Sequence, residues 1–100
     1  MTSSDLLFDA ILNGEQASID DHVKRLLSYD VSAGDILNER CIPATQEARQ
    51  RFEQGVFYLP DLFIALRSYL SALETLRPHI STQTYQQAIG YGEFDITCHL

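Results

Sequence analysis

The chain has 100 residues, 45% of them hydrophobic and 21% charged, a composition typical of a globular domain and too apolar for a disordered tail. That length predicts a single domain with one modest core. Its 14 acidic and 7 basic side chains give a formal net charge of −7, which disfavours binding to nucleic acid or to an anionic membrane surface. No apolar stretch is long enough to span a bilayer. Two cysteines without CxxC spacing and the lack of a signal-peptide pattern predict a cytoplasmic protein.

Two short helices are predicted in the first third of the chain. The first carries an apolar stripe and is expected to end at Gly14, because glycine readily adopts the backbone conformation that stops a helix. Ser18, followed three residues later by Asp21, has the spacing of a capping box and predicts the start of the second helix. This helix is expected to end near Tyr29 and Asp30.

A third helix is predicted to begin after Ser32, which can cap it, and to end at Gly55. Its apolar residues recur on one helical face: Leu37, Cys41, Ala48 and Phe52. Pro43 falls within this pattern, where it removes a backbone donor and clashes with the preceding turn. The sequence therefore predicts a kink or break near Cys41 and Ile42.

A fourth helix is predicted to begin at Pro60, a residue favoured at the first helical position, with Asp61 facing the positive end of the helix dipole. One face of this helix is apolar: Leu62, Leu66, Tyr69, Leu73 and Leu76. Arg77 and Pro78 close it. Four short helices with short loops predict an all-α protein, an antiparallel four-helix bundle over residues 1–78.

Residues 79–100 form a tail of different character. The stretch 81–91 has little helical periodicity. From Phe94 to Leu100 apolar and polar residues alternate, which is the pattern of a strand. We expect this strand, if ordered, to be truncated and to pair with something outside the chain.

The sequence shows no catalytic constellation and no glycine-rich phosphate loop. The three histidines His22, His79 and His99 are scattered and are interpreted as surface residues. Cys41 lies on the apolar stripe of the third helix and is interpreted as a small core residue. No catalytic residue and no metal ligand is therefore predicted, and the chain is not expected to be an enzyme.

The most unusual segment is the predicted corner between the third and fourth helices. Loops normally lie on the surface and are polar. Here five large apolar or aromatic side chains crowd one end of the bundle: Phe52, Phe57, Tyr58, Leu59 and Leu62. These residues either seal the end of the bundle or form an apolar lid for a flat hydrophobic group.

Three short motifs in this part of the chain occur together. Ile-Pro ends the sequence DILNERCIP at residues 42–43, Phe-Glu-x-Gly occupies residues 52–55, and Leu-Pro occupies residues 59–60. In this order they resemble the helical cap module of methyl-carrying corrinoid proteins. That family includes cobalamin-dependent methionine synthase and the corrinoid proteins of methylamine and methanol metabolism. The resemblance covers residues 5–78 and implies the same four-helix cap.

The resemblance also implies a lid over the upper face of the corrin ring. In the family, three apolar side chains shield the cobalt-bound methyl group, and the matching positions here are Phe52, Leu59 and Leu62. These are the expected cofactor-binding residues, and cobalamin in its methyl form is the expected cofactor. An apolar lid excludes water and offers no ligand to the metal. It must also move aside when the methyl donor or acceptor approaches.

The chain departs from the family pattern after the cap. The family's α/β domain carries an Asp-x-His-x-x-Gly motif whose His ligates cobalt, and Asp95 and His99 do not have that spacing. The chain thus resembles a cap that stops short. Cobalamin binding is expected only with a partner, either an α/β cobalamin-binding domain or a methyltransferase subunit. A homodimer through the apolar corner is a further expectation. The alternative is a cofactor-free helical protein-interaction module derived from this fold.

Overall fold

The computed structural model describes residues 3–93, with side chains described from Leu6 onward, and every regular element within that range is helical. The α-helices are α1 (Ser3–Asn13), α2 (Gln16–Ser28), α3 (Ala33–Ile36), α4 (Ile42–Glu53), α5 (Leu59–Leu76) and α6 (Thr82–Ile89). A π-helical turn, η1 (Leu37–Cys41), joins α3 to α4, and two 3-10 turns, η2 (Arg77–His79) and η3 (Gly90–Gly92), flank α6. The all-α prediction is confirmed, and the strand expected from Phe94 to Leu100 lies outside the described residues.

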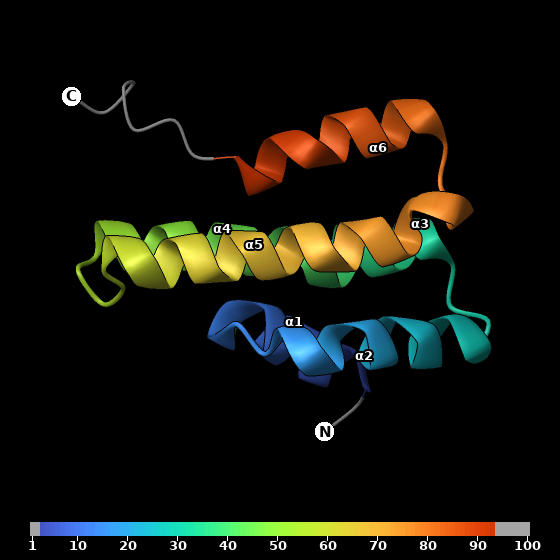
Figure 1. Ribbon diagram of the computed structural model, residues 1–100, viewed down its shortest axis with the longest axis horizontal. Helices are drawn as coiled ribbons and strands as arrows, with labels where there is room; N and C mark the ends of the chain where they lie inside the picture. The colour runs from blue at the N-terminus through green and yellow to red at the C-terminus, as the bar shows by residue number, and fades with distance from the viewer. Residues whose placement is uncertain (1–2, 94–100) are drawn as a thin grey trace.

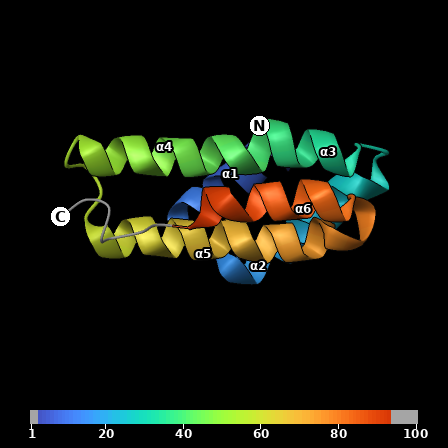
Figure 2. The ribbon, with the colours of Figure 1, turned by 90° about the horizontal axis from the view of Figure 1, so that it is seen from above.

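The helices form three layers (Figure 1). The helices α1 and α2 lie on one side of α4 and α5, and α6 lies on the opposite side. Seen from above, α6 runs along the line where α4 and α5 meet (Figure 2). Between residues 3 and 93, no helix combines the length and the apolar character needed to cross a bilayer.

The core consists of two clusters of buried side chains. The larger lies where α1, α2, η1 and α5 meet, and Tyr69 at its centre is fully enclosed. The smaller lies at the end where α4 turns into α5, and its buried members are Leu12, Ala48, Leu62, Ala65 and Leu66. Burying one large apolar side chain contributes roughly 1.5–3 kcal/mol, so these clusters supply most of the stability of the short helices.

Several predicted helix ends are confirmed. Gly14 ends α1 and Gly55 follows α4, and both have positive φ angles of 76° and 78°. At Gly14 a side chain would also collide with Ile64, so this turn and the packing of α5 require glycine. Ser32 caps α3 by accepting a hydrogen bond of 3.1 Å from the amide of Asp35.

Two predicted starts are wrong, one by three residues and the other by one. The helix α2 begins at Gln16 rather than after Ser18, whose hydroxyl instead donates to the carbonyl of Glu15 at 3.0 Å. The reason is local: the amide of Glu15 bonds back to the carbonyl of Ala10 at 2.8 Å across the turn at Gly14, and this compact helix stop leads the chain at once into α2. The helix α5 begins at Leu59, which places Pro60 second rather than first.

The predicted break near Cys41 and Ile42 takes another form. The helical backbone continues through Pro43 into α4, and the disturbance is the π-helical turn η1 just before it. The amide of Ile42 there donates to the carbonyl of Leu37, five residues back. This wider turn accommodates the proline without ending the helix.

The interpretation of residues 81–91 as lacking helical periodicity is wrong, because α6 spans most of them. Ser81 caps this helix by accepting a hydrogen bond of 3.1 Å from the amide of Thr84. Ala88 is buried in the larger core cluster, with Tyr85 and Ile89 packed against it. The helix is short and mostly polar, so its three-residue apolar stripe is a weak sequence signal. A helix of this length becomes stable only when its apolar side packs against a neighbouring core.

Candidate functional site

The loop between α4 and α5 is built as a tight, hydrogen-bonded reversal. The amides of Val56 and Phe57 both donate to the carbonyl of Arg51, at 2.8 and 3.0 Å. Asp61 then caps α5 by accepting a 2.9 Å hydrogen bond from the amide of Tyr58. This geometry turns two apolar side chains outward, since Val56 is 63% exposed and Tyr58 is 74% exposed.

The structure brings together the three residues that the resemblance selects. Leu62 belongs to the smaller core cluster, and Phe52 and Leu59 pack against the same cluster from α4 and α5. They differ in accessibility. Leu62 is fully enclosed, with 0% of its surface exposed, whereas Phe52 and Leu59 are half-buried. As the side chains lie here, a ligand at this end can touch Phe52 and Leu59, with Leu62 beneath them.

Apolar side chains also remain uncovered at this end of the molecule. Phe63 is 38% exposed and lies four residues after Leu59, on the same side of α5. We call Phe52, Val56, Tyr58, Leu59 and Phe63 the corner surface. If these residues only sealed the bundle, they would be turned inward. Instead Val56, Tyr58 and Phe63 are each more than a third exposed, so this end of the molecule presents apolar surface to solvent.

The side of α5 that carries Leu59 and Phe63 continues toward α6. Leu70, seven residues after Phe63, lies under η3, where a Cβ placed on Gly92 would be 2.6 Å from its side chain. The helix α6 and the turn η3 cover this part of α5 but stop before the corner (Figures 1 and 2). Within the described chain, the corner surface is thus the part of the α4–α5 face that α6 leaves uncovered.

The polar side chains around the corner have structural partners. Arg51 forms an ion pair with Glu47 at 2.8 Å and lies over the ring of Phe57, 5.4 Å from its centre. Among residues 3–93, no group of three or more His, Cys, Asp or Glu side chains is placed to hold a metal ion. The corner therefore offers apolar contact, and the described chain offers no metal site beside it.

One residue near the corner was not singled out by the sequence. The guanidinium of Arg49, one turn before Phe52 on α4, donates to the main-chain carbonyls of Tyr91 and Glu93, at 2.7 and 2.8 Å. This clamp holds the last described residues beside the corner. Its partners are backbone groups more than 40 residues away, so no sequence motif indicates it.

The remaining polar and sulfur groups behave largely as predicted. Cys41 is fully buried, which confirms a core residue, and burial raises the pKa of its thiol to about 12. His79 is exposed as expected, and His99 lies outside the described residues. His22 departs from the surface interpretation, because it is half-buried and its Nδ1 has no hydrogen-bond partner in the described structure.

Comparison with protein-family models identifies the family. The model described as "B12 binding domain" matches residues 4–77, which is most of the chain and includes the whole corner. No curated protein and no solved structure matches the chain. The match agrees with the resemblance seen in the Ile-Pro, Phe-Glu-x-Gly and Leu-Pro motifs. The chain thus belongs to the B12 binding domain family, the helical cap module of cobalamin-binding proteins.

Proposed function

We propose that this domain, as an antiparallel four-helix cap, covers the upper face of a corrinoid in a methyl-transfer system, with the corner surface turned toward the ring. The observation that carries the proposal is a partly exposed apolar surface at the corner where two of the family motifs, Phe-Glu-x-Gly and Leu-Pro, meet. A flat macrocycle with a methyl group on its metal needs such a cover, because water and oxidants must be kept away from the reactive bond. We propose cobalamin in its methyl form as the cofactor.

The corner suits this cofactor chemically. Cobalamin, when bound, supplies a cobalt centre that carries the methyl group. The residues of this chain then do one thing, which is to exclude water. Phe52 and Leu59 present apolar side chains without a donor atom for the metal, and Leu62 supports both from the core beneath. We therefore propose a non-catalytic role, in which the cap protects the methyl group and the acid, base and nucleophile belong to other proteins.

A partner that holds the cofactor from below completes the proposal. Between residues 3 and 93, no cluster of three or more His, Cys, Asp or Glu side chains is placed to hold a metal ion. We propose that a partner with an α/β cobalamin-binding domain, or a methyltransferase subunit, supplies the lower face. The Arg49 clamp, which fixes the carbonyls of Tyr91 and Glu93 one turn before Phe52 on α4, gives that end of the domain a defined surface for such a partner.

The experiment uses the full chain, methylcobalamin and a purified α/β cobalamin-binding domain of a corrinoid methyltransferase. The rate at which light cleaves methylcobalamin is followed by its visible spectrum. We expect the chain to slow this cleavage. With the Tyr58→Ala or Phe52→Ala variant, we expect the cleavage rate to return most of the way to that of unprotected methylcobalamin. Tyr29→Ala is a matched control, because Tyr29 is also an exposed aromatic residue, 67% exposed, but lies in the loop after α2.

The proposal is wrong if the chain binds the partner but Phe52→Ala and Tyr58→Ala protect methylcobalamin as well as the wild type does. That result would show that the corner surface does not face the cofactor. Circular dichroism of each variant shows whether the helices are intact. Because Tyr58 is largely solvent-exposed, its replacement tests the surface without disturbing the core.

A second candidate is a helical protein-interaction module that uses the same corner without a cofactor. The exposed Tyr58 and Val56 favour it, since aromatic and aliphatic side chains at such exposure also suit a protein partner or a second copy of the chain. Sedimentation of the full chain in the absence of cobalamin distinguishes the two. A dimer that Tyr58→Ala dissociates supports the interaction module, and a monomer that acquires a cobalamin spectrum with the partner supports the cap.

A further inference from the structure

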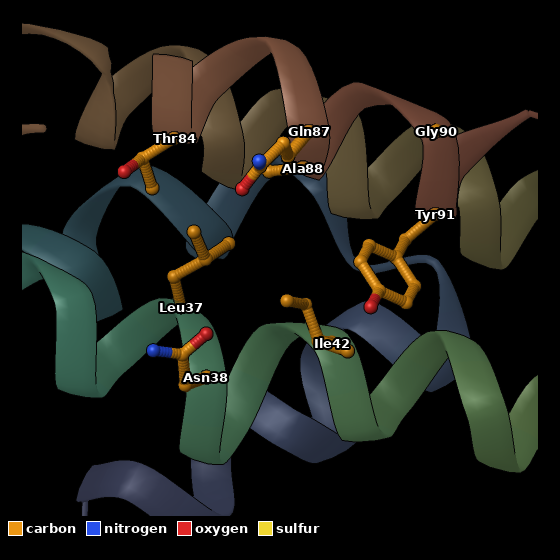
Figure 3. A pocket seen from close by; sticks show the side chains of 8 residues that line it. All are labelled: Leu37, Asn38, Ile42, Thr84, Gln87, Ala88, Gly90 and Tyr91. Carbon is orange, nitrogen blue, oxygen red and sulfur yellow. The ribbon is translucent and has the colours of Figure 1, made fainter. Parts of the chain in front are cut away.

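A groove separate from the corner lies between α6 and the helical run that joins α3 to α4. Its volume is about 530 Å³ (Figure 3). Side chains from the two sides face each other across it, with Leu37 and Ile42 below and Thr84 and Gln87 above, and Tyr91 stands at one end. This is the size of cavity that holds small molecules in proteins.

The lining of the groove selects a kind of ligand. Its floor is apolar, formed by Leu37, Ile42 and Ala88, of which Leu37 and Ala88 are buried. Its rim carries the carboxamides of Asn38 and Gln87, and among residues 3–93 no Asp, Glu, Lys, Arg or His side chain lines it. A charged ligand would lose hydration there without gaining a partner. A carboxamide is both donor and acceptor, so its best complement is another carboxamide.

The π-helical turn also leaves a backbone acceptor at Asn38, one of the residues that line the groove. In η1 the amide of Ile42 donates to the carbonyl of Leu37, five residues back. The next carbonyl, that of Asn38, has Pro43 at the matching position, and proline has no N–H to donate. The main-chain carbonyl of Asn38 is therefore left without a donor from the helix ladder. Single π-helical turns of this kind often occur at functional sites.

Both walls of the groove are held in place without a ligand. The hydroxyl of Tyr69 donates to the carbonyl of Ala88 at 2.7 Å, which fixes the last turn of α6. Arg49 fixes the end that carries Tyr91 through the carbonyls of Tyr91 and Glu93. A site with walls already in position loses little ordering entropy when a small molecule binds.

From these features we propose that the groove binds a small, uncharged, flat molecule that carries a carboxamide. The apolar floor and the ring of Tyr91 contact the flat part of the molecule. Its carboxamide pairs with the carboxamides of the rim, donating to the side-chain oxygen of Asn38 and accepting from the side-chain amide of Gln87. The proposal does not depend on cobalamin, and its test contains none.

The test is an amide chemical-shift titration of the full chain with nicotinamide, a flat neutral carboxamide, and with nicotinate, which has the same shape but carries a charge. We expect nicotinamide to shift the amide signals of Asn38, Thr84 and Gln87 with a dissociation constant on the order of 1 mM, as befits so small a molecule. Nicotinate is expected to bind at least about tenfold more weakly, because its carboxylate finds no counter-charge.

A groove-filling variant makes the test specific. Gly90 lines the groove, and a Cβ placed on it would meet no atom within 4 Å, so Gly90→Leu fits the fold and occupies the site. It is expected to abolish the shifts. Gly34→Leu is the matched control, since Gly34 also has open space around it but does not line the groove. Equal binding of nicotinamide and nicotinate, or shifts that persist in Gly90→Leu, would overturn the proposal.

Discussion

The hydroxyl of Tyr69 donates a hydrogen bond of 2.7 Å to the main-chain carbonyl of Ala88, and this bond joins the central helix α5 to α6. Tyr69 is fully enclosed, so the bond is shielded from water. Ala88 is the C-terminal member of the larger core cluster. Through this contact α6 packs as part of the core rather than as a loose tail.

Replacing Tyr69 by phenylalanine tests the strength of this link. Tyr69→Phe keeps the ring but leaves the carbonyl of Ala88 buried without its donor. We expect the free energy of unfolding to fall by about 1–3 kcal/mol. Urea denaturation followed by circular dichroism measures it, with Tyr29→Phe as the control at an exposed tyrosine. A loss equal to that of the control would show that the bond contributes nothing.

The same residue predicts how stability changes at alkaline pH. Burial raises the pKa of Tyr69 above its ordinary value of about 10, and the nearby Cys41 and Tyr91 add to this. A group whose pKa is higher in the folded state stabilises the fold fully below its unfolded pKa and loses that contribution above it. Stability is therefore expected to decline as the pH rises above about 10. In Tyr69→Phe the decline between pH 10 and 11 should be shallower, as denaturation at each pH would show.

Cys41 is expected to be chemically inert in the folded protein. Its side chain is fully buried, and burial raises the pKa of its thiol to about 12, so almost no thiolate exists near neutral pH. A thiol reagent at pH 8 should react only when the chain unfolds. The measurement uses a Cys98→Ser background so that Cys41 is the cysteine observed. Reaction at the rate of a free thiol, without urea, would contradict the prediction.

Arg49 is expected to hold the end of α6 against α4. Its guanidinium donates to the carbonyls of Tyr91 and Glu93, so Arg49→Ala removes both bonds. Because the side chain is partly exposed, we expect a loss of about 1 kcal/mol in local stability, or several-fold faster amide hydrogen exchange over residues 88–93. Arg67→Ala, at an exposed position on α5, serves as control. Unchanged exchange in Arg49→Ala would exclude the clamp.

Two glycines are expected to respond with opposite sign to replacement by alanine. Gly14 has a φ of 76°, and an added Cβ would overlap Ile64, so Gly14→Ala should destabilise the fold by about 2 kcal/mol or more. Gly34 lies in α3 with open space around it, so Gly34→Ala should stabilise by up to about 1 kcal/mol. Thermal denaturation of the two variants measures both. A Gly14→Ala variant as stable as the wild type would show that the turn does not require glycine, and a destabilised Gly34→Ala variant would contradict the second expectation.

Much of the fold could be predicted from local chemistry. The stops at Gly14 and Gly55, the cap at Ser32 and the apolar face of α5 depend on residues that are neighbours in the chain. The Phe-Glu-x-Gly and Leu-Pro motifs at the corner also consist of residues that are neighbours in the chain. The start of α2 was misplaced because the turn before it depends on the amide of Glu15 bonding back to Ala10, a contact that the capping pattern does not contain.

The sequence by itself determined where the main helices lie, which of their faces are apolar, and that Phe52, Leu59 and Leu62 fall at one corner. Only the tertiary structure decided that Leu62 is enclosed while Phe52 and Leu59 stay half-open, and that α6 forms and stops before that corner. The physical reason is the range of the interactions. Caps, stops and periodicity act within a few residues, whereas the exposure of a side chain depends on what distant segments bring to it.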